Sequence, residues 1–223
     1  EQLQNINLRR AINLAIARSD FAKNVLKDGS VAAQGFVPSG LTLSPQETDF
    51  RDDAGSYLSY DLTQAQQYLD AALQELGVSE ITLELLYGNN EAPNDTAAEY
   101  LESALSKLNG LNIEMKVESK NARLEDMTNG NFDMAVTRWG PDYADPTTYL
   151  TLYSTTNSNN DGKYSNVAYD EILNQITTAA DASTRWQLMI QAEKMLMDDY
   201  AMVPIFEKGG CALWNTDYEG LVI

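Results

Sequence analysis

Apolar residues near the N-terminus recur at close to helical spacing, at Ile6, Leu8, Ile12, Leu14 and Ile16. This spacing predicts a helix, and a second short helix is expected over residues 21–27, where Gly29 then ends it. Between residues 30 and 60 the apolar positions lose their period, and glycine and proline recur. We therefore expect a long surface connection there, and a connection of this length is usually functional or packed against another element.

The middle of the chain alternates between helical and strand periods. Helical spacing begins after Asp61 and ends at Gly77, and the next apolar stretch has the length and alternation of a strand. Continued to residue 137, the pattern predicts helices over 62–76, 93–108 and 122–127 and strands over 80–87, 112–118 and 132–137. Strands that alternate with helices pair in parallel through right-handed crossovers, so the pattern predicts an α/β fold.

The last third of the chain is mainly helical by the same criteria. A loop rich in glycine, proline and aspartate starts at Trp139, and Asp145-Pro146 opens a short helix. After a polar loop over 154–163, the pattern predicts helices over 167–178 and 183–199, a strand over 202–206 and an apolar segment over 212–214. The methionines around the last helix are expected to fill the core, at Met189, Met195, Met197 and Met202.

The chain carries a large negative charge, which excludes several kinds of partner. Its 223 residues include 15 Lys and Arg against 33 Asp and Glu and no histidine, for a formal charge of −18. A nucleic acid or an anionic membrane surface would repel such a protein. No apolar run approaches the roughly 18 residues that a membrane-spanning helix needs.

The absence of histidine restricts the possible chemistry. The chain lacks the usual general base, the usual zinc or nickel ligand and every nucleophile–histidine pair, so hydrolase triads are excluded. Cys211 is the only cysteine and cannot form an internal disulfide, which leaves the redox compartment open. We expect no cofactor and no metal. The first residues do not resemble a secretion signal, so any targeting signal has been removed or was never included.

A short polar segment partly matches a calcium-binding loop. Residues 157–162 place oxygen-bearing side chains at the first, third and fifth positions and glycine at the sixth, as an EF-hand loop does. The glutamate required at the twelfth position is replaced by Ala168, and the first position is Asn157. We therefore interpret this segment as a solvated loop.

Two aspartates three positions apart follow the strand expected over 132–137. Ligands of open α/β sheets gather beyond the carboxyl ends of the strands, so Asp142 is a candidate ligand-binding carboxylate. Asp145 precedes a proline and is better explained as a helix N-cap. A glycosidase would need two carboxylates across a cleft with separated pKa values, and this loop offers neither.

Three side chains beside Asp142 have two interpretations each. Trp139 and Tyr143 either belong to the core or form a pocket wall that contains one charged group. Arg138 either contributes to that site or pairs with a neighbouring aspartate.

Several segments resemble one family, and they occur in its order along the chain. They are Leu8 to Ile16 (LRRAINLAI), 35–38 (GFVP), 132–146 (FDMAVTRWGPDYADP), Asn159-Asn160, 164–173 (YSNVAYDEIL) and 199–205 (DYAMVPI). Together they resemble the solute-binding proteins of oligopeptide and dipeptide ABC importers, the bacterial extracellular solute-binding protein family 5. The family often has Ile-Asp-Arg where this chain has Ile16-Ala17-Arg18, so one ion pair of that family is not expected here.

The resemblance implies one lobe of a type II periplasmic-binding-protein-like fold, with a central sheet flanked by helices and ligand-facing loops at one end. Family members are more than twice as long, so we expect residues 1–223 to be an excised C-terminal lobe of a two-lobed protein. Within it, 1–60 would hold the entry helices and the long connection, and 61–138 the β-α-β core. Residues 139–223 would hold the ligand loop, the C-terminal helices and a return strand.

The resemblance also implies a function without a chemical reaction. The whole protein would capture an extended oligopeptide between its two lobes and deliver it to the permease subunits of an importer. Asp142 would meet the α-ammonium of the peptide, Trp139 and Gly140 would offer backbone contacts, and Arg138 and Tyr143 would line the same site. The protein would be a monomer outside the cytoplasm, either periplasmic or anchored to the outer face of the cell membrane as a lipoprotein.

Three alternatives remain open from the sequence. The same fold could bind an oligosaccharide, or it could serve as a receptor for signalling peptides without a transporter. A glycoside hydrolase that uses Asp142 with a partner elsewhere is the third alternative. Nickel and haem carriers of the same family fit less well, because this lobe has no histidine.

Overall fold

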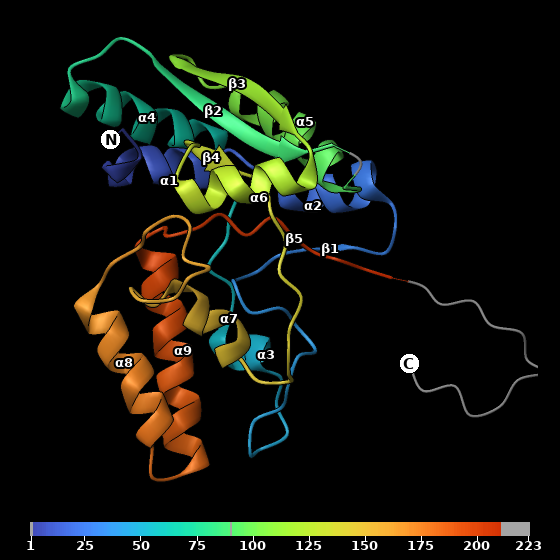
Figure 1. Ribbon diagram of the computed structural model, residues 1–223, viewed down its shortest axis with the longest axis vertical. Coiled ribbons are helices and arrows are strands. Elements are labelled where there is room, and N and C mark those ends of the chain that lie inside the picture. The colour runs from blue at the N-terminus through green and yellow to red at the C-terminus, as the bar shows by residue number, and fades with distance from the viewer. Residues whose placement is uncertain (1, 90, 211–223) are drawn as a thin grey trace, which may run out of the picture.

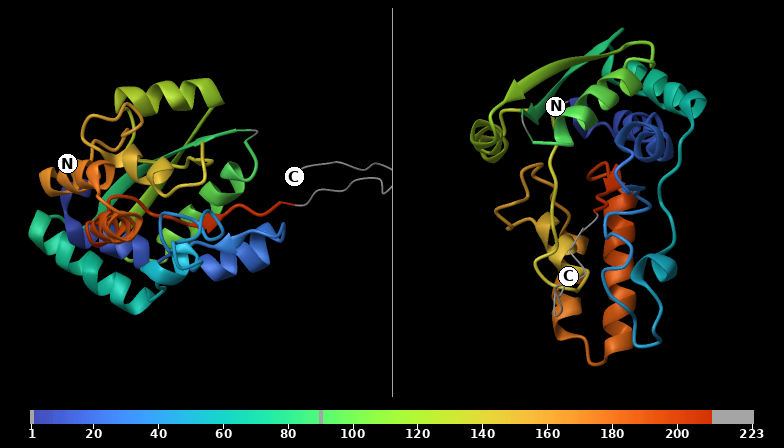
Figure 2. Two further views of the ribbon diagram at one scale, coloured as in Figure 1. Left: turned by 90° about the horizontal axis from the view of Figure 1, so that it is seen from below. Right: turned by 90° about the vertical axis from the view of Figure 1, so that its right-hand side faces the viewer.

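The computed structural model describes residues 2–89 and 91–210, and these form two halves. In Figure 1 a sheet and the helices packed on it lie above a group of helices that includes α7, α8 and α9. We call them the sheet half (α1, α2, α4–α6 and β2–β4) and the helical half (α3 and α7–α9). Extended segments connect the halves, as the right-hand view of Figure 2 shows.

The sheet half contains three parallel strands in the order β3-β2-β4. Their bounds are Ile81–Gly88 for β2, Leu111–Glu118 for β3 and Met134–Ala135 for β4. The α/β fold and the parallel pairing predicted from the sequence are therefore confirmed. The strand predicted over 132–137 is wrong in length, since only two of those residues pair. The Asp133 carboxylate accepts the Glu84 N–H at 2.9 Å, so a side chain occupies the place that a paired backbone carbonyl would take.

Helices cover the sheet on both sides (Figures 1 and 2). Helices α1 (Ile6–Leu14) and α4 (Leu62–Leu76) pack against each other, and α4 ends at Gly77 as predicted, with φ of 69°. Helix α5 (Asn94–Leu105) is shorter than predicted at its C-terminal end, whereas α6 (Lys120–Asn129) is longer at both ends because Ser119 caps it and Gly130 ends it. The short helix predicted over 21–27 is a π-helical segment, η2 (Phe21–Leu26), and the three residues before it form α2 (Arg18–Asp20).

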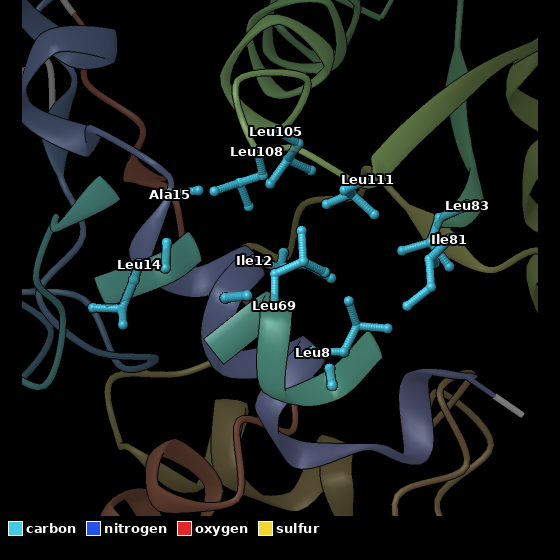
Figure 3. Close-up of a cluster of buried hydrophobic side chains, with 13 residues drawn as sticks. Leu8, Ile12, Leu14, Ala15, Leu69, Ile81, Leu83, Leu105, Leu108 and Leu111 are labelled. Atoms are coloured by element: carbon cyan, nitrogen blue, oxygen red, sulfur yellow. The ribbon is translucent and has the colours of Figure 1, made fainter. Parts of the chain in front are cut away.

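Apolar side chains from these helices bury one face of β2. Figure 3 shows the cluster in which α1 and α4 meet the start of β2 and the end of α5. Its labelled members are Leu8, Ile12, Leu14, Ala15, Leu69, Ile81, Leu83, Leu105, Leu108 and Leu111. A neighbouring cluster continues along β2 through Leu85 to Phe21 and Val136. Because this face is buried in a close-packed core, the sheet is rigid, and the loops that follow its strands start from fixed positions.

The helical half has its own apolar core. It consists of α3 (Phe50–Ala54), α7 (Thr147–Leu150) and the longer α8 (Val167–Thr178) and α9 (Ala182–Asp198), with the single turn η3 (Thr151–Tyr153) after α7. The predicted bounds of α8 are confirmed, and those of α9 differ by one residue at each end. Met189 and Met197 are buried, and Met195 and Met202 pack on this core, which confirms their predicted role.

The segment predicted to be one long connection over 30–60 contains α3 and a short strand, β1 (Val31–Ala32). Strand β1 pairs antiparallel with β5 (Phe206–Glu207), outside the three-stranded sheet. The return strand predicted over 202–206 is therefore displaced, and only its last residue lies in β5. Pro204 has no N–H to donate to a strand partner. The apolar segment predicted over 212–214 lies outside the described residues.

Arginines of the sheet half hold the chain that returns from the helical half. The Arg9 guanidinium donates to the Asp199 carbonyl from Nε and Nη2, at 3.2 and 3.1 Å. Arg18 is buried and donates to the Pro204 carbonyl at 2.6 Å and to the Asn13 side chain at 2.7 Å. Burial lowers the pKa of Arg18 to about 10. As the sequence around Ala17 indicated, Arg18 bonds to carbonyl oxygens here and forms no ion pair within the described chain.

Candidate functional site

The candidate residues lie on the segment that leaves β4 and enters α7. Figures 1 and 2 show this segment as an extended trace that crosses from the sheet half to the helical half. It follows the carboxyl end of a parallel strand, which is the position expected of ligand-binding loops. All residues over 137–144 are exposed, so the segment is a surface loop with no apolar core of its own. We call residues 137–146 the ligand loop.

Asp142 presents a free carboxylate on this loop. Its backbone N–H donates to Thr148 Oγ1 at 2.9 Å, and Thr148 is buried at the start of α7. Among the described residues, no hydrogen bond or ion pair engages the Asp142 carboxylate. An unpaired surface carboxylate can meet a cation without first breaking an internal contact.

Asp145 has the structural role that its position before a proline indicated. Its Oδ1 accepts the Thr147 N–H at 3.0 Å and the Thr147 hydroxyl at 2.6 Å, which caps the first turn of α7. Arg185 of α9 contacts both carboxylate oxygens, at 2.6 and 3.0 Å. Burial alone would raise the pKa of Asp145, but the hydrogen bonds from Arg185 and Thr147 hold that pKa below its ordinary value.

The aromatic residues beside Asp142 are on the surface. Trp139 is 39% exposed and Tyr143 is 51% exposed, so of the two interpretations the core location is wrong. The Tyr143 hydroxyl lies 3.4 Å from Thr147 Oγ1. Both rings can therefore contact a molecule that reaches the ligand loop.

Gly140 and Arg138 are also exposed on this loop. A Cβ atom at Gly140 would meet nothing within 4 Å, so the surrounding structure leaves room beside its backbone. Arg138 is exposed, and within the described part of the chain it belongs to none of the ion pairs. Of the two interpretations of Arg138, the pairing with a neighbouring aspartate is therefore wrong.

A second loop at the same edge of the sheet carries a buried ion pair that the sequence did not reveal. Glu91, after the end of β2, accepts from Arg123 Nε of α6 at 3.0 Å, and both side chains are largely buried. A Cβ atom at Gly88 would lie 1.8 Å from the Glu91 carboxylate, so only glycine lets this pair form. No spacing or periodicity marks these residues as partners, because they lie 32 positions apart on different elements.

In the segment with a partial resemblance to a calcium loop, the side chains of Asn157 and Asn160 bond to nearby backbone. Asn160 Nδ2 donates to the carbonyls of Ser154 and Tyr164, and Asn160 Oδ1 accepts the Tyr164 N–H at 3.0 Å. Asn157 Oδ1 accepts the Asn159 N–H at 2.8 Å. These contacts give Asn157 and Asn160 a role in the fold of the loop itself.

Two cavities in the described structure do not include Asp142 in their lining. One of about 370 Å³ is lined by Gln2, Leu3, Leu83 and Asp133. The other, of about 340 Å³, lies between α7, α8 and α9 and includes Thr147, Thr151 and Arg185. Neither is lined by Arg138, Trp139, Gly140, Asp142 or Tyr143, so the described chain offers the ligand loop as one open wall. Within the same residues, no helix is both long and apolar enough to cross a membrane.

Comparison with known proteins identifies the class to which this fold and loop belong. The model for bacterial extracellular solute-binding proteins, family 5 (middle region), matches residues 1–161. The chain belongs to this family, as the resemblance in its sequence indicated.

The relatives extend the match over nearly the whole chain. The dipeptide-binding protein of Lactococcus lactis subsp. cremoris (strain MG1363) is 36% identical over 223 residues, which cover 98% of this chain. A crystal structure of the peptide-binding protein of a peptide ABC transporter superposes with a TM-score of 0.87 at 32% identity and covers 92% of each chain. OppA of Listeria monocytogenes bound to peptide gives a TM-score of 0.86 at 37% identity over 93% of this chain. The fold of one lobe of a periplasmic-binding-protein architecture is therefore confirmed.

The chain is much shorter than most of these relatives. It spans 40% of the Lactococcus protein and 40% of the Listeria chain. If a binding site in such a longer protein is formed partly by residues outside this region, the present chain contains only one wall of that site.

Proposed function

We propose that this chain is the C-terminal lobe, residues 1–223, of a two-lobed peptide-binding protein that serves an ABC importer. The observation that carries the proposal is the ligand loop, which follows the carboxyl end of β4 and carries an unpaired Asp142 carboxylate together with the exposed rings of Trp139 and Tyr143. The membership of the family and the peptide-binding names of its relatives support a peptide as the ligand. Segment 1–60 would supply the entry helices and long connection, 61–138 the β-α-β core, and 139–223 the ligand loop from Trp139 onward, the C-terminal helices and the return segment.

Each candidate residue has a role in this proposal. Asp142 pairs with the α-ammonium of the peptide, and the backbone of Trp139 and Gly140 contacts the peptide main chain. Arg138 and Tyr143 line the same wall, where their exposed side chains reach the ligand. Closure of a second lobe over this wall excludes water and strengthens the charged contact.

The proposal includes the cellular setting. The protein binds its ligand without chemical change and hands it to membrane permease subunits. It acts as a monomer outside the cytoplasm, in the periplasm or on the outer face of the membrane as a lipoprotein. The family of extracellular solute-binding proteins supports this setting.

Substitution of Asp142 tests the proposal in the full-length protein. Asp142→Asn keeps the shape of the side chain and removes its charge, which leaves the peptide ammonium without a partner. We expect affinity for a free tripeptide to fall by about 2–5 kcal/mol in isothermal titration. Asp198→Asn, which removes an exposed carboxylate of α9, is the matched control and should change affinity little.

An N-acetylated peptide provides the complementary measurement. It lacks the ammonium, so the wild type should bind it about as weakly as Asp142→Asn binds the free peptide. Equal affinity of the wild type for the free and acetylated peptides would refute the role of Asp142. No binding of any peptide by the wild type would refute the proposed function itself.

A further inference from the structure

The ligand loop depends on few contacts for its shape. Its exposed residues over 137–144 bury no apolar side chain. Within the described chain, the loop is held near Asp142 by the bond from its N–H to Thr148 Oγ1, and near Tyr143 by the bond from the Asp145 N–H to the Tyr143 carbonyl, at 2.9 Å each. A loop with so few contacts is positioned mainly by the point where it joins the folded body.

At the start of the loop this point is buried Val136, whose N–H donates to the Leu86 carbonyl at 2.8 Å, and at the end that enters α7 it is Asp145. The Asp145 carboxylate caps α7 through Thr147, and the Asp145 backbone carbonyl accepts the Thr148 N–H at 3.1 Å. Thr148 in turn binds the Asp142 N–H, so Asp145 and Asp142 share the same first turn of α7 as their support. Displacement of Asp145 would therefore displace Asp142.

Arg185 connects Asp145 to a distant part of the chain. It lies on α9, 40 positions after Asp145, and its two terminal nitrogens contact the two carboxylate oxygens at 2.6 and 3.0 Å. Two parallel bonds fix the orientation of a carboxylate as well as its distance, which a lysine would not do. Because α9 packs on α7 and α8, the position of α9 affects the position of the ligand loop through Arg185 and Asp145.

We propose that Arg185 is a positioning residue for ligand binding, which acts through Asp145 to hold the Asp142 carboxylate where the ligand cation meets it. This inference rests on the proposed function. Arg185 and Asp145 are both partly exposed, at 36% and 27%, and ion pairs of this exposure add little to folding. Their contribution to a preorganised site is larger, because a loop that is already in place loses less freedom on binding.

A double-mutant cycle in the full-length protein tests this role. The probe is the tripeptide Ala-Ala-Ala, with isothermal titration as the measurement and the variants Arg185→Met, Asp142→Asn and their combination. We expect Arg185→Met to weaken binding about tenfold or more, and the combination to bind within about twofold of Asp142→Asn alone. Residues that act through one another show such non-additivity, whereas independent residues show additive losses.

Two controls separate this role from a general structural one. Lys194→Met removes one positive charge from an exposed i,i+4 pair on the same helix and should change affinity less than about twofold. The thermal midpoint of Arg185→Met should lie within a few degrees of that of the wild type. A large fall of this midpoint, additive losses in the cycle, or equal effects of Arg185→Met and Lys194→Met would overturn the proposal.

The cycle also distinguishes this inference from the proposed function. If the wild type binds no tripeptide, or if Asp142→Asn binds as well as the wild type, the proposed site is wrong and Arg185 has nothing to position. If Asp142→Asn weakens binding but Arg185→Met does not, the proposed site stands and the role of Arg185 is refuted.

Discussion

Arg51 and Glu193 form a buried ion pair although 142 positions separate them in the sequence. The pair joins α3 to α9, and the Glu193 side chain is fully buried. Arg51 Nη1 donates to Glu193 Oε1 at 2.8 Å, and Arg51 Nη2 contacts the other oxygen. Glu193 Oε1 also accepts the N–H groups of Phe36 and Val37, each at 2.8 Å. One carboxylate thus connects three segments of the helical half.

Removal of either partner should destabilise the protein strongly. Glu193→Ala leaves the Arg51 charge buried and two backbone N–H groups without an acceptor, so we expect a loss of about 3–5 kcal/mol of unfolding free energy. Urea unfolding followed by circular dichroism measures this loss. The double variant Arg51→Met/Glu193→Met should lose less than the sum of the two single variants, because no unpaired charge remains. A loss below about 1 kcal/mol for Glu193→Ala would contradict this account.

Gly35 should be irreplaceable because of the same ion pair. A Cβ atom at this position would lie 1.7 Å from Arg51 Nη1, so an alanine would force the buried guanidinium out of place. We expect Gly35→Ala to cost about 1–3 kcal/mol or more in urea unfolding. Gly162→Ala is the control, since a Cβ atom there meets nothing within 4 Å, and its effect should stay within about 0.5 kcal/mol. Equal effects of the two substitutions would refute the steric explanation.

The contribution of Asp145 should depend on pH in a defined direction. Its pKa is lower in the folded state than its ordinary value, because the hydrogen bonds from Arg185 and Thr147 outweigh its burial. The unfolded state therefore binds more protons in the acidic range, and the stabilisation is present above the ordinary pKa and is lost as the pH falls through the lowered one. We expect Asp145→Asn, which keeps a capping side chain but removes the charged pair with Arg185, to cost up to about 1 kcal/mol at pH 7 and clearly less at pH 3, by urea unfolding. A cost that is unchanged at pH 3 would contradict this linkage.

The chain of residues 1–223 by itself should bind peptide weakly. The ligand loop is one open wall, and it lines neither of the two cavities described above. A second wall supplies much of the burial and desolvation on which affinity depends. Isothermal titration with a mixed peptide library should detect no binding tighter than about 1 μM. Nanomolar binding by this chain alone would refute the two-lobed arrangement.

Local signals were sufficient for most of the helices and for the positions of β2 and β3 along the chain. Asp61 and Gly77 mark both ends of α4, and the alternation after them predicts β2 and β3 as a parallel pair. Such signals are readable because capping and periodic burial involve residues a few positions apart. The loop after β4 could be recognised in the same way, since it combines glycine, proline, an aspartate and aromatic residues at the end of a strand.

The remaining features were decided by contacts between distant residues. The pairing of β1 with β5 joins positions 31 and 207, and the short β4 results from the Asp133 side chain taking a strand's hydrogen bond. Arg185 had no visible role in the sequence, because its partner lies 40 positions away and neither residue belongs to a periodic pattern. The sequence alone therefore determined the α/β pattern and the position of the loop after β4. Only the tertiary structure decided how that loop is held, because an ion pair depends on where two elements meet and leaves no mark in either of them.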